Sequence, residues 1–217
     1  FRSAEAPEVA SRAAAVGARI VGLHAHAGSG VLDVANWVHV GEVLVGLRSV
    51  FPHAKVFDLG GGLGVPDRVG GVALDLRSLD AALAALRAKL GDAELWLEPG
   101  RFVIAEAGVL LARVTQIKSK GSSAYVGVAT GMNSLIRPAL YGAHHDIVNL
   151  SRLGAEPLAV FDVVGPICET GDVLGHDRTL PAATQEGDVL LIATAGAYGA
   201  SMASHYNLRP PAAEILL

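Results

Sequence analysis

The sequence has very little cysteine, and this scarcity limits its chemistry. Cys168 is the one cysteine among 217 residues, so no disulfide can form within the chain, and a lone thiol suits a reducing cytoplasm. No apolar run approaches the roughly 20 residues that a membrane-spanning helix needs, and no signal peptide is visible. The formal net charge is −4 and no basic run occurs. We therefore expect a cytoplasmic protein that binds neither membranes nor nucleic acid.

Apolar residues are abundant even though long apolar runs are missing. They make up 51% of the sequence, and the mean hydropathy is +0.42. Because they are spread over short segments, we expect large buried faces or a subunit interface. The chain also starts without Met and inside a helix-like pattern, so we expect the natural protein to begin further upstream.

The first half of the sequence alternates between strand and helix patterns. Residues 18–30, 55–64 and 93–101 read as strands, and residues 36–51 and 78–91 read as helices. This order predicts parallel strands, in a doubly wound sheet or in part of a (β/α)8 barrel. Each predicted strand ends in polar or glycine-rich sequence, at the end where barrels gather their ligand-binding groups.

The second half has a different pattern. Residues 108–121, 122–131, 157–175 and 187–199 are β-rich runs divided by glycine and proline. No long helical period interrupts them, so we predict a separate antiparallel β domain. The fold class is therefore α/β followed by β: the C-terminal part of a (β/α)8 barrel over residues 1–107, then an antiparallel β domain over residues 108–217.

The segment HAHAGSG, residues 24–30, supports three interpretations. Because side chains alternate along a strand, His24 and His26 would share a face. They could bind a metal, as in metal-dependent hydrolases, but of the further ligands this needs only Asp58 is a candidate. Alternatively, His26 stacks on a flat ring while Ser29 and Gly30 hold an anion. An ordinary buried, hydrogen-bonded histidine is the interpretation that fits His24 better.

Two other strand ends carry distinctive sequence. DLGGGLG, residues 58–64, would expose consecutive backbone N–H groups that can bind phosphate, although a tight turn is an equal alternative. In EPGR, residues 98–101, Gly100 offers an N–H group, Arg101 can grip a phosphate or carboxylate, and Glu98 would face a protonated nitrogen. A pyridinium ring with a phosphate arm meets these demands together, which predicts pyridoxal phosphate as the cofactor.

These motifs also resemble a known family. With MNSLIRPALYGAHHDI (residues 132–147), GPICETGD (165–172) and AGAYGASMASHYNLRPPAAEIL (195–216), they follow the order seen in diaminopimelate decarboxylases. That family belongs with the ornithine and arginine enzymes to the alanine-racemase-like, pyridoxal-phosphate-dependent decarboxylases. RPALYGAHH with CETGD favours diaminopimelate over ornithine. Some bacterial relatives are fused to an aspartate kinase, and the sequence leaves open whether this one is.

The resemblance implies roles for particular residues. In relatives, the residues matching Cys168 and Glu169 reach the active site from the other subunit of a homodimer. Cys168 would return a proton to the substrate, Glu169 would recognise its distal amine, and His26 would stack on the cofactor ring. The implied cofactor-binding residues are His26, Ser29, Gly60, Gly61, Gly62, Glu98, Gly100 and Tyr198. The residues implied to bind the distal end of an amino-acid substrate are Arg101, Arg137, Tyr141 and Glu169.

The lysine that would hold the cofactor as a Schiff base has no match in this chain. The four lysines are Lys55, Lys89, Lys118 and Lys120, and none follows a barrel strand. About three strand–helix units are present instead of eight. We therefore expect the C-terminal portion of a decarboxylase, which is inactive alone and which self-associates or binds a partner that supplies the missing half.

The implied reaction is decarboxylation of meso-2,6-diaminopimelate to L-lysine. A non-catalytic interaction or regulatory module of the same family is an alternative, supported by the missing lysine. A related decarboxylase of arginine or a polyamine precursor is another, and the metal-dependent hydrolase is a third. The adjacent His144 and His145 are expected to be surface or interface residues.

Overall fold

The structure is a computed structural model that describes residues 2–217. It divides into two compact units, each described by itself. The first unit comprises the chain up to Val65 together with Val72–Phe102, and the second comprises Pro66–Gly71 and Val103–Leu217. Among the described residues, no helix is long and apolar enough to cross a membrane.

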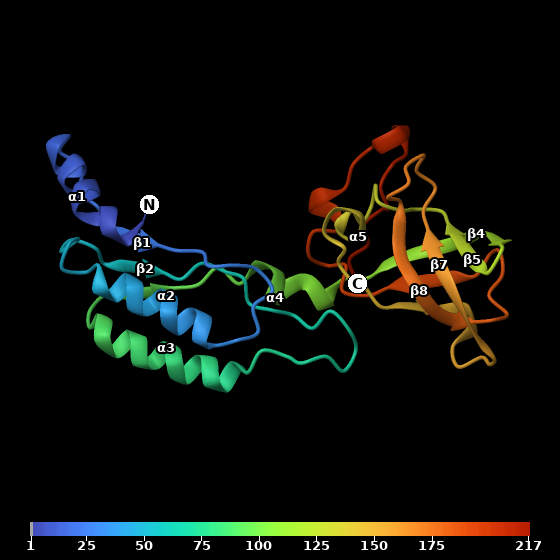
Figure 1. Ribbon diagram of the computed structural model, residues 1–217, viewed down its shortest axis with the longest axis horizontal. Helices are drawn as coiled ribbons and strands as arrows, with labels where there is room; N and C mark the ends of the chain where they lie inside the picture. Colours follow the sequence, from blue (N-terminus) through green and yellow to red (C-terminus); the bar gives the residue numbers. More distant parts are fainter. Residues whose placement is uncertain (1) are drawn as a thin grey trace. The chain divides into compact units, whose positions relative to one another are not determined.

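The first unit is built on a small parallel sheet. Strands β1 (Gly22–His24), β2 (Val56–Asp58) and β3 (Glu94–Trp96) pair in that order, in parallel. Helices α2 (Ala35–Gly46) and α3 (Leu76–Leu90) connect the strands and lie side by side (Figure 1). The predicted strand order is confirmed, and the described residues contain no closed barrel.

Helices α2 and α3 follow from capping and packing. The Asp75 carboxylate accepts the backbone N–H groups of Arg77 and Ser78 at the start of α3, and Gly91, with φ +65°, ends the helix. Gly41 of α2 lies so close to Leu86 of α3 that a β-carbon there would overlap the leucine side chain.

The hydrophobic core of the first unit includes both helices. Trp37 of α2 is fully buried in it, whereas Trp96 of β3 is 51% exposed. The unit also contains η1 (Ser3–Glu5) and α1 (Ala6–Ala15) before the sheet. Helix α4 (Gly100–Ile104) follows β3.

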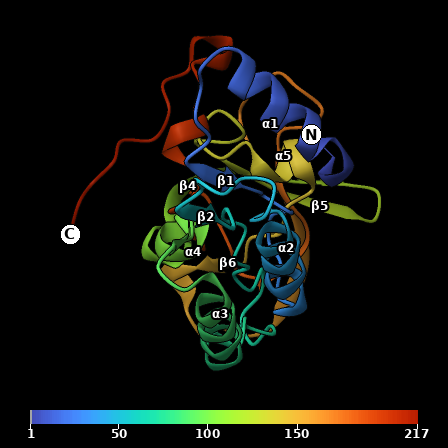
Figure 2. The same cartoon turned by 90° about the vertical axis from the view of Figure 1, so that its left-hand side faces the viewer.

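The second unit is a six-stranded sheet with its own core. Its strand order is β6-β9-β4-β5-β7-β8, and the outermost strands β6 and β8 contact each other, so the sheet nearly closes on itself. The strands are β4 (Leu110–Lys120), β5 (Ser123–Val128), β6 (Ile147–Asn149), β7 (Leu158–Val164), β8 (Val173–Pro181) and β9 (Val189–Ile192). Residues 209–217 form no helix or strand, and they appear as an extended trace that ends at the C-terminus in Figure 2.

The prediction that this sheet is antiparallel is wrong for one pair. Strands β5 and β7 run parallel, with Tyr125 opposite Asp162, while the other pairs are antiparallel. The long connection between β5 and β7, which contains α5 (Arg137–Tyr141) and β6, allows the parallel return that a tight hairpin could not make. The remaining short helices are η2 (Ala105–Ala107), η3 (Leu150–Arg152), η4 (Ala200–Met202) and η5 (Tyr206–Leu208).

Candidate functional site

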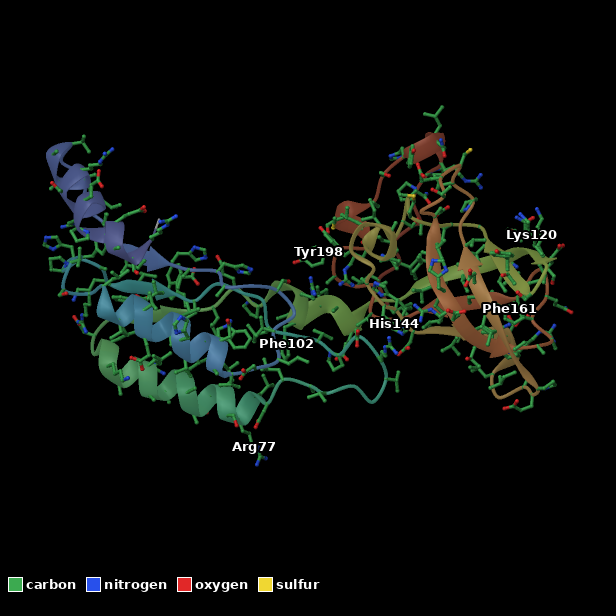
Figure 3. The ribbon with its side chains drawn as sticks, viewed as in Figure 1. Arg77, Phe102, Lys120, His144, Phe161 and Tyr198 are labelled. Carbon is green, nitrogen blue, oxygen red and sulfur yellow. The ribbon has the colours of Figure 1, made fainter. Side chains whose placement is uncertain are left out.

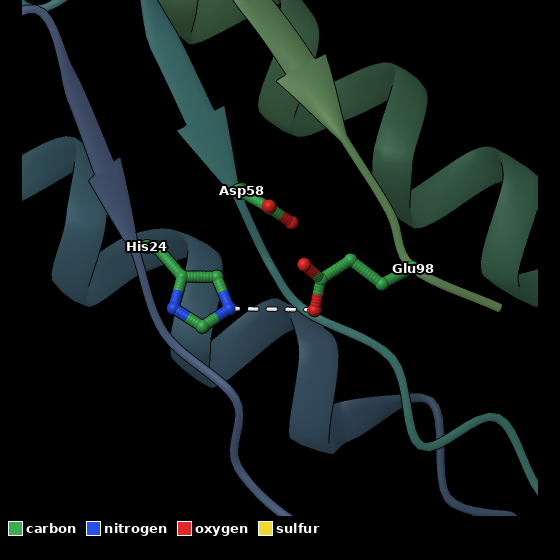
Figure 4. Close-up of side chains that lie close together, drawn as sticks. All are labelled: His24, Asp58 and Glu98. Atoms are coloured by element: carbon green, nitrogen blue, oxygen red, sulfur yellow. Dashed lines mark ion pairs between the residues drawn. The ribbon is translucent and has the colours of Figure 1, made fainter. Parts of the chain in front are cut away.

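Three polar side chains meet at the carboxyl end of the first unit's sheet. His24 ends β1, Asp58 ends β2, and Glu98 lies two residues beyond β3. Their ligand atoms all lie within 4.8 Å of one another, and His24 Nε2 is 3.4 Å from Glu98 Oε2 (Figure 4). Parallel strands bring these groups together because their carboxyl ends share one edge of the sheet. We call His24, Asp58 and Glu98 the strand-end cluster.

The glycine loop after β2 packs directly against this cluster. The Glu98 N–H group donates to the Gly60 carbonyl at 3.0 Å. A β-carbon on Gly61 would overlap the Glu98 carbonyl oxygen, so only glycine fits there. The Gly61 N–H group donates to His26 Nδ1 at 3.1 Å, which leaves His26 Nδ1 as an acceptor. Glu98 and His26 therefore lie against Gly60 and Gly61 of this loop, as expected, while their roles in cofactor binding stay predictions.

The predicted row of exposed N–H groups in this loop is only partly present. The Gly60 N–H group donates to Asp58 Oδ1 at 2.9 Å, and that of Gly61 is bound to His26. The Gly100 N–H group donates to the Glu98 carbonyl at 2.9 Å. Two of the three loop glycines thus donate to neighbouring side chains. Through these bonds the loop also holds the side chains of Asp58 and His26 in place.

Ser29 and Arg101 complete the first unit's candidate residues. Ser29 is exposed and lies in the turn between β1 and α2, next to Gly30. The Arg101 guanidinium approaches that turn, since a β-carbon on Gly30 would lie 3.5 Å from Arg101 Nη1. A serine, a positive-φ glycine and a guanidinium beside one another can hold an anion.

The interpretation of His24 as a buried histidine is wrong. Its side chain is 52% exposed, and it faces the 56% exposed side chain of Glu98. The strand ends at His24, so its ring lies at the rim of the sheet, where solvent reaches it.

The metal interpretation also changes. Among the described residues, the only cluster that could hold a metal ion is the strand-end cluster, in which Glu98 takes the place expected for His26. His26 instead binds the glycine loop. Two carboxylates and a histidine at a sheet rim occur commonly without a metal, so this cluster does not indicate a hydrolase.

The strand-end cluster fits a cofactor with a cationic ring nitrogen. Glu98 offers a partly exposed carboxylate beside His24, and His26 offers an aromatic face held in place by the Gly61 N–H group. The nearby Ser29–Gly30 turn and Arg101 offer an anion-binding group. An acid, an aromatic ring and an anion site match the ring nitrogen, the ring face and the phosphate of pyridoxal phosphate, so these residues fit that cofactor, although the Schiff-base lysine has no match in this chain.

In the second unit, two predicted substrate-binding residues mark the ends of α5. Arg137 begins the helix, and Tyr141 ends it with 64% exposure. The Arg137 Nη1 atom lies 3.0 Å from His145 Nε2. This helix was not predicted from the sequence, because a helix of five residues is too short to show a period.

Cys168 and Glu169 lie together on an exposed loop of the second unit. The Cys168 N–H group donates to Asn207 Oδ1 at 2.9 Å, and the Tyr206 hydroxyl donates to Glu169 Oε2 at 3.3 Å. Hydrogen bonds from the Thr170 backbone and hydroxyl, and from Tyr206, lower the pKa of Glu169 below its ordinary value. Cys168 itself is exposed.

A buried aspartate shapes this loop. Asp172 is 3% exposed, and its two oxygens accept the N–H groups of Met132 and Ile167, each at 2.6 Å. β-Carbons at Gly131 and Gly165 would both overlap its carboxylate. Asp172 therefore ties the segment before α5 to the loop that carries Cys168.

Tyr198 has an unusual backbone conformation. Its φ is +65°, in the left-handed region that bulky residues rarely adopt, and its side chain is 41% exposed. It lies in the second unit, just before η4 (Figure 3). Backbone strain of this kind, at a residue whose side chain is accessible to solvent, is common at functional sites.

None of the four lysines lies in the strand-end cluster. Lys55 precedes β2 and pairs with Asp92 at 2.5 Å, and Lys89 of α3 pairs with Glu42 of α2. Lys118 and Lys120 lie on β4. Their placement agrees with the expectation that none holds a cofactor at the strand ends.

The expectation for His145 is wrong as well. It is 0% exposed, contrary to the surface or interface position expected for it. The signal was the alternation of His145, Ile147 and Asn149, all buried, with the more accessible Asp146 and Val148. His144, which is partly buried, contacts Arg178 and Asp146.

A pocket of about 430 Å³ opens beside β8 in the second unit. Its polar lining includes Arg68, His144 and Arg178 (Figure 3 labels His144). Arg178 donates to His144 Nδ1 at 2.7 Å, and His144 Nε2 lies 2.9 Å from Asp146 Oδ1. Asp146 also accepts the Val69 N–H group at 2.7 Å, so these bonds fasten the 66–71 segment to the second unit.

Comparisons with known proteins agree on one group of relatives. The family model described as the C-terminal sheet domain of pyridoxal-dependent decarboxylases matches residues 31–196. A curated protein of Archaeoglobus fulgidus named diaminopimelate decarboxylase is 42% identical over 206 residues, which are 91% of this chain and 48% of that protein. The chain therefore spans about half the length of the curated relatives it matches.

Solved structures give the same result. A protein from Aquifex aeolicus superposes with a TM-score of 0.93 and 38% identity, over 100% of this chain and 54% of the other. Diaminopimelate decarboxylase from Helicobacter pylori, complexed with L-lysine, superposes with a TM-score of 0.82 and 35% identity. That match covers 96% of this chain and 52% of the other.

Proposed function

Because the chain belongs to the pyridoxal-dependent decarboxylase family, we propose that it forms part of an enzyme that converts meso-2,6-diaminopimelate to L-lysine. The curated relatives that it matches at about 40% identity are named diaminopimelate decarboxylase, and related structures hold L-lysine. The observation that carries the proposal is the packing of the Gly60–Gly62 loop, His26 and Glu98 at one rim of the parallel sheet.

In this proposal the two units have different tasks. Residues 1–107 contribute three strands of a (β/α)8 barrel whose other strands lie outside this chain, and residues 108–217 form the β domain. The parallel order β1-β2-β3, with helices between the strands, supports the first assignment. The separate core of the six-stranded sheet supports the second.

The first unit would hold pyridoxal phosphate, which when bound supplies the electron sink for loss of the α-carboxylate. Glu98 would pair with the ring nitrogen, because a carboxylate favours the protonated form of a neighbouring base. His26 would stack on the ring. The family resemblance also assigns cofactor binding to Ser29, Gly60, Gly61, Gly62, Gly100 and Tyr198.

Selection of the substrate would fall to charged groups that match its distal amino-acid end. Arg101, Arg137 and Tyr141 would bind the distal carboxylate, and Glu169 would bind the distal amine. The lowered pKa of Glu169 keeps this carboxylate anionic near neutral pH, as recognition of an ammonium group requires.

The complete enzyme would act as a homodimer in which Cys168 and Glu169 reach the partner's active site. Both residues are exposed on the loop that Asp172 holds. From that loop Cys168 would return a proton to the substrate. A reducing cytoplasm, which keeps this single thiol reduced, is the proposed compartment.

The first test is release of carbon dioxide by the full-length protein. With pyridoxal phosphate and meso-diaminopimelate it should form lysine, whereas the present chain should not, because none of its lysines lies at the strand ends. Release at an enzyme-like rate by the chain alone, or none by the full-length protein, would contradict the proposal.

Matched variants of the full-length protein sharpen this test. Glu98→Gln should lower kcat about 100-fold or more, because the electrostatic partner of the ring nitrogen is lost. Glu94→Gln, a change at an exposed residue of β3, should leave kcat nearly unchanged. Equal effects of the two glutamate variants would argue against the assignment of Glu98.

A third variant tests the proposed substrate contact. Arg137→Gln should raise KM for diaminopimelate without weakening cofactor binding in a spectroscopic titration.

A further inference from the structure

His145 lies in a sealed position beside a proposed substrate-binding residue. It is 0% exposed and precedes β6 by two residues, so its side chain points inward with those of Ile147 and Asn149. A buried imidazole must have its nitrogens satisfied by hydrogen bonds, since an unmade bond in a protein interior is costly.

Both nitrogens have partners, and these partners fix the position of the proton. His145 Nδ1 is 2.8 Å from the Ala193 carbonyl oxygen, which can only accept, so Nδ1 carries the hydrogen. His145 Nε2 is 3.0 Å from Arg137 Nη1, which can only donate, so Nε2 is the acceptor. The neutral Nδ1–H tautomer is the form that makes both bonds.

The surroundings disfavour a charged ring. Burial lowers the pKa of His145, and the neighbouring guanidinium groups of Arg137 and Arg178 lower it further, while the bond to Ala193 opposes these effects. The nearest carboxylate in sequence, Asp146, is bound by His144 and by the Val69 N–H group. Asp177, beside Arg178, is exposed on β8.

From this geometry we propose that His145 is a positioning residue. Its neutral imidazole fixes the Arg137 guanidinium in the orientation that receives the distal carboxylate of the amino-acid substrate. A guanidinium has five N–H donors, so a bond to His145 is compatible with a bidentate grip on a carboxylate. The inference rests on the proposed function, because it assigns the carboxylate to Arg137.

Two amide variants separate the two bonds of the ring in the full-length enzyme. The side chain of Gln reaches the position of Nε2, so His145→Gln keeps an acceptor for Arg137. The side chain of Asn reaches the position of Nδ1, so His145→Asn keeps only the bond to Ala193. His145→Asn should raise KM for meso-diaminopimelate about tenfold or more, and His145→Gln less than about threefold, with pyridoxal phosphate affinity unchanged in both.

The outcomes distinguish this inference from the proposed function. If the wild-type full-length protein releases carbon dioxide but the two variants change KM equally, His145 has only a structural role. If the wild type is inactive, the proposed function itself fails.

A second measurement needs no activity and no variant. Nitrogen-15 NMR of the His145 ring should show the Nδ1–H tautomer, without protonation, across the neutral pH range. An Nε2–H tautomer, or an ordinary histidine titration, would overturn the proposal.

Discussion

Individual carboxylates in this protein are held by hydrogen bonds that outweigh the cost of burial. Asp188 of the second unit is 6% exposed, yet it accepts from Arg152 Nε at 2.6 Å and from Asn149 Nδ2 at 3.0 Å. Burial raises its pKa, but the bonds from Asn149, Arg152 and the Gln185 N–H group bring the pKa below its ordinary value. The ionised form is therefore the one that stabilises the fold.

Replacing Asp188 should destabilise the protein in a pH-dependent manner. Asp188→Asn should lower the free energy of unfolding by about 2 kcal/mol at neutral pH, because a charged acceptor of several bonds is lost. The folded-state pKa lies below the unfolded value, so this contribution is complete above about pH 4 and is lost as the pH falls through the folded pKa. Urea unfolding at neutral and acid pH measures it.

The neighbouring Glu186 provides the control for this prediction. It is exposed in the same turn, so Glu186→Gln should change stability by less than about 0.5 kcal/mol. A stability difference between wild type and Asp188→Asn that stayed constant down to pH 2 would contradict the account of this carboxylate.

Elements differ in how well the sequence predicts them. Strands β1 to β3 and the helices between them were predictable, because short apolar runs that end in polar or glycine-rich sequence define the strands, and periodic leucines and Gly91 define α3. The strand-end cluster was predictable because parallel strands end at a common edge. Helix α5 is too short for a period to appear, the alternation around β6 covers only a few residues, and the parallel pairing of β5 with β7 depends on residues far apart in sequence. The role proposed for His145 depends on Ala193, which follows β9, and on Arg137 of α5, and the local sequence pattern shows neither contact.

The contact between α2 and α3 makes a prediction at the element scale. Gly41→Ala should destabilise the protein by about 1–3 kcal/mol, because the new methyl group overlaps Leu86. Leu86→Ala should cost about 2–5 kcal/mol through the cavity that it leaves. In the double variant the alanine methyl group has room, so the combined loss should be smaller than the sum. Thermal unfolding followed by circular dichroism tests this.

Gly46 provides the control position for the Gly41→Ala variant. It also belongs to α2, but a β-carbon there would meet nothing within 4 Å. Gly46→Ala should therefore be neutral or slightly stabilising, since alanine favours helix. If the losses of Gly41→Ala and Leu86→Ala were strictly additive, the two residues would not be in the tight contact described.

At the scale of the whole molecule, the small sheet exposes two edges. Among the described residues, the outer edges of β1 and β3 pair with no further strand, and Trp96 on β3 is 51% exposed. Unpaired edges with apolar side chains favour association with other chains. In the proposed full-length enzyme, the remaining strands of the barrel would cover these edges.

The chain alone should therefore self-associate. Sedimentation velocity should detect species heavier than the 22.3 kDa monomer at micromolar concentration. Trp96→Ser should weaken this association, whereas Leu208→Ser, which removes an exposed apolar group in the second unit, should not. A strictly monomeric wild type would contradict the prediction, and equal effects of the two variants would place the association elsewhere.

The distribution of tryptophan has a practical consequence. Both tryptophans of the chain, Trp37 and Trp96, belong to the first unit, and Trp37 is fully buried. All four tyrosines lie in the second unit. With excitation at wavelengths that tyrosine does not absorb, indole emission therefore reports on the first unit alone. Melting curves recorded by emission and by the amide absorption bands will coincide only if the two units unfold cooperatively.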